Sequence, residues 1–432
     1  MLSIPIMFAT LLKVEIGILF FISLVPIISL MKKIAELPAG NQFVDMILLA
    51  IILGWFFGAL KESRKIFTRS PLNWAVLLVM LGSVINLIRG YTFMELPDAE
   101  LIKLKAWKNY IILPVIYFIS INNIGKEKFV KWIIVCVCIS MLAMDFNFYT
   151  TFRWFKSEHY SHSMRISGPL SFLGPNELGI FYSMYTFLLL GISYFVDNRK
   201  LKYLLLFVCA CNLYPILYSF SRSGYMCAVA GILFLGVMKD RKFLLLLIVL
   251  VIFYRLVLPT SVVERIDMTF LDKEEISAEQ EKASAFEVGD SAIEITGRKH
   301  LWEKAWNYFK AEPLLGIGFD NFRQKEGWIT HSMFFRILAE EGLVGVTIFC
   351  LFTFMILQQA FKLFRRSGTR LGKGVGLGFL LCALVHLVGS ITGETHLYYN
   401  LMAIYWVFLG IVGSFNIEYV GDAGRISKVD TK

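Results

Sequence analysis

The chain has 432 residues, of which 57% are hydrophobic and only 18% are charged, and its mean hydropathy is +0.63. These values exclude an ordinary water-soluble domain and indicate an all-α polytopic membrane protein. The net charge of +10 would favour nucleic-acid binding in a soluble protein. In a membrane protein much of it anchors the chain to anionic lipids, so we expect membrane lipids as partners and no nucleic acid.

Twelve apolar stretches are predicted to be transmembrane helices, because each is close to the roughly 20 residues that a helix needs to cross a bilayer. They are residues 14–31, 43–60, 72–88, 106–122, 129–147, 176–196, 203–219, 223–238, 243–258, 342–361, 374–391 and 398–415. The expected organisation is nine helices in residues 1–258, one large loop at 259–335, and three helices with a tail in 336–432.

Five of the loops between these helices are rich in lysine and arginine, and a twelve-helix arrangement places all five on one side of the membrane. Basic loops are retained in the cytoplasm. Both termini are therefore predicted to be cytoplasmic, and residues 260–331 to lie on the periplasmic side of the inner membrane. Lys32 and Lys33 are the exception, because the arrangement places them outside. The basic residues of the five loops are Lys61, Arg64, Lys65 and Arg69; Lys126, Lys128 and Lys131; Arg199, Lys200 and Lys202; Lys239, Arg241 and Lys242; and Lys362, Arg365, Arg366, Arg370 and Lys373.

Residues 147–175 form an outward segment that is rich in aromatic and basic side chains and includes Arg165. Its glycines and prolines are expected to break helical structure and to form turns. Asn176 follows them, and we predict that it is the N-cap of the sixth helix, because an asparagine oxygen can accept hydrogen bonds from the free N–H groups of the first turn.

Arg222 lies in the short connection Phe220–Tyr225 between the seventh and eighth helices, on the predicted outer side. A charge beside hydrocarbon is costly and usually has a partner. Two interpretations stay open at this point: Arg222 reaches lipid phosphates or an acidic residue, or it binds a phosphate of the substrate.

The run from Thr260 to His331 is polar and aromatic inside an otherwise apolar chain. Its acidic part, residues 272–290, is predicted to be a solvated helix or a cover. From Gly297 onward, apolar residues recur at helical spacing and predict an amphipathic helix that ends before Pro313. These apolar positions are Leu301, Trp302, Ala305, Trp306 and Phe309.

Two glycines, Gly316 and Gly318, permit a sharp turn after this helix. Residues 331–341 are predicted to form a further helix that leads into the tenth span. His331 is therefore expected near the start of a helix at the outer membrane boundary.

Three side chains on the predicted outer face, Arg222, Arg298 and His331, together indicate chemistry on a lipid-borne phosphate. The planar guanidinium of arginine binds phosphate in two places, and a histidine of near-neutral pKa can take a proton from an attacking hydroxyl. Singly, Arg298 is also explained by a salt bridge and His331 by helix capping. No Asp-Xaa-Asp motif occurs, which disfavours a metal-held diphosphate, so neither a metal nor a cofactor is expected.

These residues resemble the bacterial O-antigen ligase and polymerase superfamily, which includes lipopolysaccharide O-antigen ligases, related polymerases and pilin-type O-oligosaccharyltransferases. The resemblance covers roughly residues 160–345. The features that carry it are the run Arg165 to Gly179, Ser221-Arg-Ser-Gly224, Gly297-Arg298 before Trp302 and Trp306, Pro313-Leu-Leu-Gly-Ile-Gly-Phe-Asp-Asn-Phe322, and His331 followed by Phe335-Arg-Ile-Leu-Ala-Glu-Glu-Gly342.

The resemblance implies a metal-independent, inverting, membrane-type (GT-C-like) glycosyltransferase. It would move a preassembled glycan from undecaprenyl diphosphate to a lipid A-core or other glycan acceptor. By position, Arg222 and Arg298 would bind the diphosphate and His331 would activate the acceptor hydroxyl. Further contacts to the phosphate or the glycan would come from Arg165, Asn176, Trp302 and Arg323.

Three alternatives stay open. One dominant outer loop favours a ligase, but the sizeable segment 147–175 is also compatible with a polymerase, and a protein O-oligosaccharyltransferase would carry the same motifs.

A transporter or flippase would instead place polar residues near the bilayer midplane. The candidates for such positions are Gly82, Asn86, His386 and Glu394. Charges gathered at one membrane face favour surface chemistry over alternating access.

Overall fold

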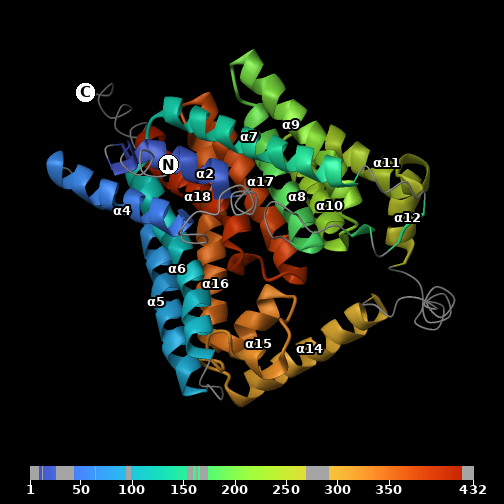
Figure 1. The fold of residues 1–432 in the computed structure, drawn as a ribbon. Coiled ribbons are helices and arrows are strands. Elements are labelled where there is room, and N and C mark those ends of the chain that lie inside the picture. Colours follow the sequence, from blue (N-terminus) through green and yellow to red (C-terminus); the bar gives the residue numbers. More distant parts are fainter. Residues whose placement is uncertain are drawn as a thin grey trace.

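The computed structural model describes residues 9–11, 13–25, 43–63, 65–93, 99–152, 159–161, 164–165, 174–268 and 291–420. Within these residues every regular element is a helix (Figure 1). In chain order the helices are α2 (Val14–Leu24), α4 (Phe43–Lys61), α5 (Pro71–Thr92), α6 (Ala99–Asn123), α7 (Glu127–Phe152), α8 (Pro175–Ser193), α9 (Arg199–Tyr218), α10 (Arg222–Met238), α11 (Lys242–Val257), α12 (Thr260–Asp267), α14 (Ser291–Ala311), α15 (Asn321–Glu326), α16 (Met333–Arg366), α17 (Arg370–Thr392), the 3₁₀ turn η4 (Thr395–Leu397) and α18 (Tyr399–Tyr419). The predictions for Lys32, Lys33, Arg64 and the acidic residues 272–290 fall outside the described residues.

Each of the twelve predicted spans overlaps one of these helices. Among the described residues, seven helices are long and apolar enough to cross a membrane, and an eighth is added if α11 and α12 form one span across their 110° bend. The seven are α5, α6, α7, α9, α16, α17 and α18. The chain is therefore a helical, multi-pass membrane protein, and the count of twelve spans stays a prediction.

The loops predicted to share one side of the membrane come together at one end of the helix bundle. Direct contacts join each of them to the next or to the end of α18. The contacts are Thr68 N with Asn122 Oδ1 at 2.6 Å, Gly125 O with the Tyr419 hydroxyl at 3.4 Å, Gly368 N with Tyr419 O at 3.3 Å, Arg370 with Asp197 at 2.9 Å, and the Tyr194 hydroxyl with Asp240 at 3.3 Å. We call this the basic end, and the other end of the bundle the opposite end.

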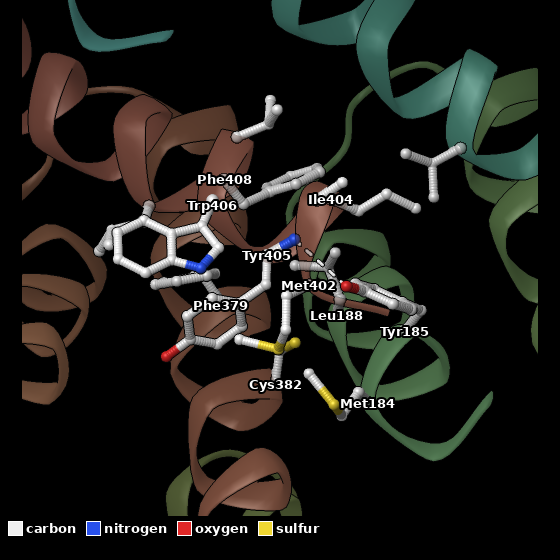
Figure 2. Close-up of a cluster of buried hydrophobic side chains, with 14 of the residues drawn as sticks. Met184, Tyr185, Leu188, Phe379, Cys382, Met402, Ile404, Tyr405, Trp406 and Phe408 are labelled. Carbon is white, nitrogen blue, oxygen red and sulfur yellow. Dashed lines mark hydrogen bonds between the residues drawn. The ribbon is translucent and has the colours of Figure 1, made fainter. Parts of the chain in front are cut away.

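The centre of the bundle is made by α8, α17 and α18, whose residues are almost all buried. Figure 2 shows side chains from these three helices packed together, among them Tyr185, whose hydroxyl donates to Leu401 O and accepts from the backbone N–H of Tyr405 at 3.2 Å. Helices α8 and α17 approach so closely that a Cβ at Gly191 would lie 2.5 Å from the Cα of Gly378. Nearer the candidate site, a Cβ at Gly389 of α17 would lie 2.8 Å from Cγ2 of Ile180 in α8, so the start of α8 also packs closely against the end of α17.

Helix α16 is broken at Gly342, which has φ +62° and ψ −156°. The break frees backbone groups that cannot stay unpaired at a membrane boundary. The residues after α14 supply their partners: Leu343 N donates to Pro313 O at 2.8 Å and Val344 N to Leu314 O at 3.1 Å. On the other side of the break, Ile317 N and Gly318 N donate to Ala339 O and Glu340 O, each at 2.9 Å. Residues 313–318, which we call the clip, thus complete the broken helix.

The predicted turn at Gly316 and Gly318 is confirmed, because both have positive φ, at +62° and +89°. A Cβ at Gly318 would lie 2.2 Å from the backbone nitrogen of Gly90 in α5, so the clip also packs directly on α5. Arg89 Nε donates to Gly316 O at 2.6 Å, and buried Lys103 of α6 donates to Asn321 Oδ1, also at 2.6 Å. Helices α14 and α15 are thereby held beside the ends of α5, α6 and α16 (Figure 1).

Candidate functional site

His331 precedes α16, as predicted, and lies between two buried residues, Thr330 and Ser332. Its φ of +55° is in the left-handed region, which non-glycine residues occupy at a cost. The backbone N–H of Ser332 donates to the Thr330 hydroxyl oxygen at 3.2 Å, and Trp302 Nε1 of α14 donates to Thr330 O at 2.9 Å. Neighbouring side chains thus hold the half-buried His331 in a strained conformation.

Glu394, between α17 and η4, anchors the same segment from the membrane bundle. Its Oε1 accepts hydrogen bonds from the backbone N–H and the hydroxyl of Thr330, both at 2.7 Å. Its second oxygen lies 3.7 Å from Nε of Arg336, which forms a closer pair with Glu340 at 3.0 Å. All three charged side chains are buried, as paired charges can be.

A second group of contacts gathers at the start of α8. Asn176 Oδ1 accepts from Arg165 at 3.0 Å and from the Ser221 hydroxyl at 3.3 Å. Ser221 caps α10 by accepting from Gly224 N, and half-buried Arg222 is the first residue of that helix. Asn176 therefore joins Arg165 to the connection that carries Arg222.

The predicted N-cap role of Asn176 is wrong. Helix α8 begins at Pro175, and its N-cap is Gly174. Proline suits the first helical position, because its missing N–H would be unpaired there and its φ is already helical. This leaves the Asn176 side chain inside the first turn, where it is available to Arg165 and Ser221.

Glu177, the next residue, connects the two groups. Its carboxylate interacts electrostatically with the guanidinium groups of Arg298 and Arg165 and with the carboxylate of Glu394. Because Glu394 also holds Thr330 by hydrogen bonds, Glu177 and Glu394 link the His331 segment electrostatically to two of the predicted phosphate-binding arginines. The structure thus gathers residues from five separated stretches of the chain at the opposite end.

Helix α12 braces the connection before Arg222. Phe220 has a left-handed φ of +49°, and its carbonyl accepts from Nε of buried Arg265 in α12 at 3.2 Å. The Arg265 guanidinium also lies over the ring of Tyr160, at 5.1 Å. Glu264 accepts from the backbone N–H of Tyr160 at 2.6 Å, so α12 also holds part of residues 147–175, which we call the second outer segment.

Arg298 lies within α14, which is longer than predicted. The helix begins at Ser291, six residues before the predicted start at Gly297, and ends at Ala311 as expected before Pro313. Gly297 is tolerated in the interior because a glycine lowers helix stability only by about 1 kcal/mol relative to alanine. Arg298 itself is half-buried.

Two other predicted substrate contacts have partners within the protein. Arg323 forms a double hydrogen bond with Asp320, at 2.9 and 2.6 Å, and this bonding raises the pKa of the arginine. Trp302 bonds to Thr330 and stacks on Phe335 with ring centroids 4.9 Å apart. In the structure, Arg323 and Trp302 therefore support other parts of the protein. A contact of either residue with the substrate stays a prediction.

Sequence reasoning did not select Glu177, Arg265 or Glu394 as site residues. Glu177 lies in the motif Gly174-Pro-Asn-Glu-Leu-Gly179, and the glycine and proline pattern of this motif could have indicated it as a site residue. Glu394 stood out only as a polar residue near a predicted span. No sequence pattern indicated Arg265, because its role depends on a hydrogen bond to the Phe220 carbonyl, which is distant in sequence.

The arrangement can bind an anion and can move a proton. Arginines from α10, α14 and the second outer segment offer guanidinium donors, and the His331 imidazole can accept a proton. Among the described residues, no three His, Cys, Asp or Glu side chains are grouped so as to hold a metal ion. Independence from metal stays a prediction.

The comparison with known families agrees with these positions. Residues 204–350, about a third of the chain, match the family model described as O-antigen ligase. The match includes Arg222, Arg298 and His331, whereas Asn176 and Glu394 lie outside it. No match to a curated protein was found. Residues 204–350 are thus similar to the O-antigen ligase family, and this match supports the resemblance seen in the sequence.

Proposed function

We propose that the protein is an O-antigen ligase that transfers a preassembled glycan from undecaprenyl diphosphate to a lipid A-core acceptor. The observation that carries the proposal is that Glu177 and Glu394 link Arg298, Arg165 and the His331 segment at the opposite end, by electrostatic interaction and by the hydrogen bonds of Glu394 to Thr330. The family match supports the class of reaction. The proposal places this end at the periplasmic face of the inner membrane, because the basic end would be retained in the cytoplasm.

The arginines would hold the diphosphate of the donor. Arg222 and Arg298 can each bind phosphate oxygens in two places, and their fixed charge would stabilise the negative charge that grows on the leaving diphosphate. Glu177 would keep Arg298 and Arg165 partly neutralised and oriented before the donor arrives. Preorganised donors of this kind lower the barrier without rearranging during the reaction.

His331 would accept the proton of the acceptor hydroxyl as that oxygen attacks the anomeric carbon. The new C–O bond forms as the bond to the diphosphate breaks, so the configuration inverts and the diphosphate leaves with both electrons. Diphosphate is already a good leaving group, so no general acid is required. The proposal therefore needs neither a metal nor a cofactor.

A polymerase is the second candidate, and one observation favours it. Arg165 comes from the second outer segment and reaches the site through Asn176, so two outer segments contribute to it. A polymerase would use the same donor site with a second lipid-linked glycan as acceptor. A protein O-oligosaccharyltransferase would differ only in taking a hydroxyl of a protein side chain.

The test is glycan transfer by the purified protein with EDTA present, offering lipid A-core and, separately, a second donor molecule. His331→Asn is the informative variant, because asparagine tolerates the left-handed backbone while removing the base. We expect a loss of about 10²- to 10⁴-fold, the usual contribution of a general base. Arg298→Ala should also lose activity, whereas its exposed neighbour Lys299→Ala is the matched control.

Transfer to lipid A-core that both variants lose would support the ligase. Products extended on the donor lipid would instead support the polymerase. Transfer that persists unchanged in His331→Asn would contradict the proposed chemistry. If the stable wild-type protein transfers to neither acceptor, both proposed reactions are wrong.

A further inference from the structure

Glu394 lies outside the segment that matches the family and is a contact through which the membrane bundle holds the histidine-bearing segment. We infer that Glu394 is the positioning residue for His331, fixing the direction in which the imidazole points toward the acceptor. The inference rests on the proposed function for the role of His331. The anchoring of the segment by Glu394 can be tested without it.

The contact is made to the residue directly before the histidine. Thr330 is fully buried, and its backbone N–H and hydroxyl both donate to one oxygen of Glu394 at 2.7 Å. The same hydroxyl also lies 2.7 Å from Ser332 O, and its oxygen accepts from Ser332 N, on the other side of His331. One carboxylate oxygen of Glu394 therefore restrains the backbone on both sides of the histidine. It binds Thr330 N directly, and it reaches Ser332 N through the Thr330 hydroxyl.

The conformation of His331 needs such support. A left-handed φ of +55° is disfavoured for histidine, and a segment without anchors would relax to an ordinary backbone conformation. Trp302 holds the Thr330 carbonyl from α14, but α14 belongs to the outer loop itself. Glu394, directly after α17, adds an anchor from the membrane bundle.

Glu394 is itself held rigidly. Its side chain is 2% exposed, and it lies directly before Thr395, whose hydroxyl contacts His386 at 2.9 Å and Ser390 at 3.0 Å in α17. Its second oxygen faces Arg336. A carboxylate beside the first turn of α16 also complements the positive end of that helix.

The position of Glu394 also links the base to the phosphate-binding side of the site. Glu394 and Glu177 interact electrostatically, and Glu177 interacts with Arg298 and Arg165. A change at Glu394 would therefore move the histidine relative to the arginines. A misplacement of about 1 Å can cost about 100-fold in rate.

The experiment is a double-mutant cycle in the transfer assay, combined with hydrogen exchange of residues 328–333. Glu394→Gln keeps one acceptor oxygen but removes the charge, and Thr330→Val removes the hydroxyl from the other side of the contact. We expect each to lower kcat about 10- to 100-fold with little change in KM for the donor, and to speed exchange in this segment. Glu303→Gln, which alters an exposed carboxylate of α14, is the control and should do neither.

In the His331→Asn background, Glu394→Gln should cause no further loss of kcat, because a residue that acts through the histidine has nothing left to position. Full additivity of the two changes would overturn the inference, since it would mean that Glu394 acts by another route. Unchanged exchange in Glu394→Gln and in Glu394→Ala would also overturn it. If exchange rises while the wild-type protein transfers no glycan, the anchoring stands and the proposed function fails.

Discussion

Replacement of Gly342 by alanine tests whether the break in α16 and the clip form one structural unit. Gly342 has φ +62° and ψ −156°, a region that is almost restricted to glycine. A Cβ there would lie 2.6 Å from the carbonyl carbon and oxygen of Leu314 and 2.7 Å from Pro313 O. These are backbone atoms, so the neighbours cannot move aside cheaply.

The expected cost has two parts. Holding alanine in this backbone region costs about 1–3 kcal/mol. Moving the clip away weakens the bonds from Leu343 N to Pro313 O and from Val344 N to Leu314 O, each contributing about 0.5–1.5 kcal/mol. Together these give about 2–6 kcal/mol of lost stability.

Gly327→Ala is the matched control. Gly327 also has a positive φ, of +73°, but nothing lies within 4 Å of its added Cβ. Its cost should be the backbone term alone, about 1–2 kcal/mol. Comparison of the two variants therefore isolates the contacts of the clip.

The assay is thermal unfolding of both variants in the same detergent, followed by glycan transfer at a temperature where each remains folded. We expect Gly342→Ala to lower Tm at least twice as far as Gly327→Ala and to lower the transfer rate, because the half of α16 next to His331 is re-aimed. Equal shifts in Tm for the two variants would refute the assignment of the clip.

Two further changes probe the outer layer. In Glu326, burial alone would raise the pKa, but hydrogen bonds from Lys304 and a tyrosine hydroxyl, with the charge of Lys304, lower it. A lowered pKa means that the ionised pair stabilises the fold above the ordinary glutamate pKa and that this is lost as the pH falls through the lowered value. The Tm difference between the wild type and Glu326→Gln should therefore be largest near neutral pH and vanish in acid; a constant difference would contradict this. Trp302→Phe removes the donor to Thr330 O. It should lower the stability of the fold by about 0.5–1.5 kcal/mol and lower kcat several-fold, with the exposed Trp306→Phe as the control. Equal effects of the two variants would show that the bond to Thr330 O is unimportant.

Several parts of the structure followed from local sequence signals. The end of α14 before Pro313 and the positive φ of Gly316 and Gly318 depend on the chemistry of those residues alone. The convergence of the basic loops followed from charge counting, because topology constrains which loops share an end. The position of His331 just before α16 followed from the onset of helical periodicity.

Other parts depend on contacts between distant segments, which periodicity does not encode. The break at Gly342 is stable because residues 313–318 complete its hydrogen bonds. The sequence close to Gly342 does not predict these bonds. Glu394 lies 64 residues beyond Thr330, so its role is visible only when α17 is packed. The prediction that Asn176 caps the sixth helix was wrong because asparagine is a favourable N-cap residue and lies only two positions after the true N-cap, Gly174.

The measurement that tests the central claim most directly is a structure of the protein with an undecaprenyl-diphosphate-linked glycan bound. The proposed function predicts the diphosphate at the opposite end, within hydrogen-bond distance of Arg298 and of Arg222 or Arg165, with the anomeric carbon facing His331. A donor whose diphosphate lies at the basic end, or contacts none of these arginines, would contradict it.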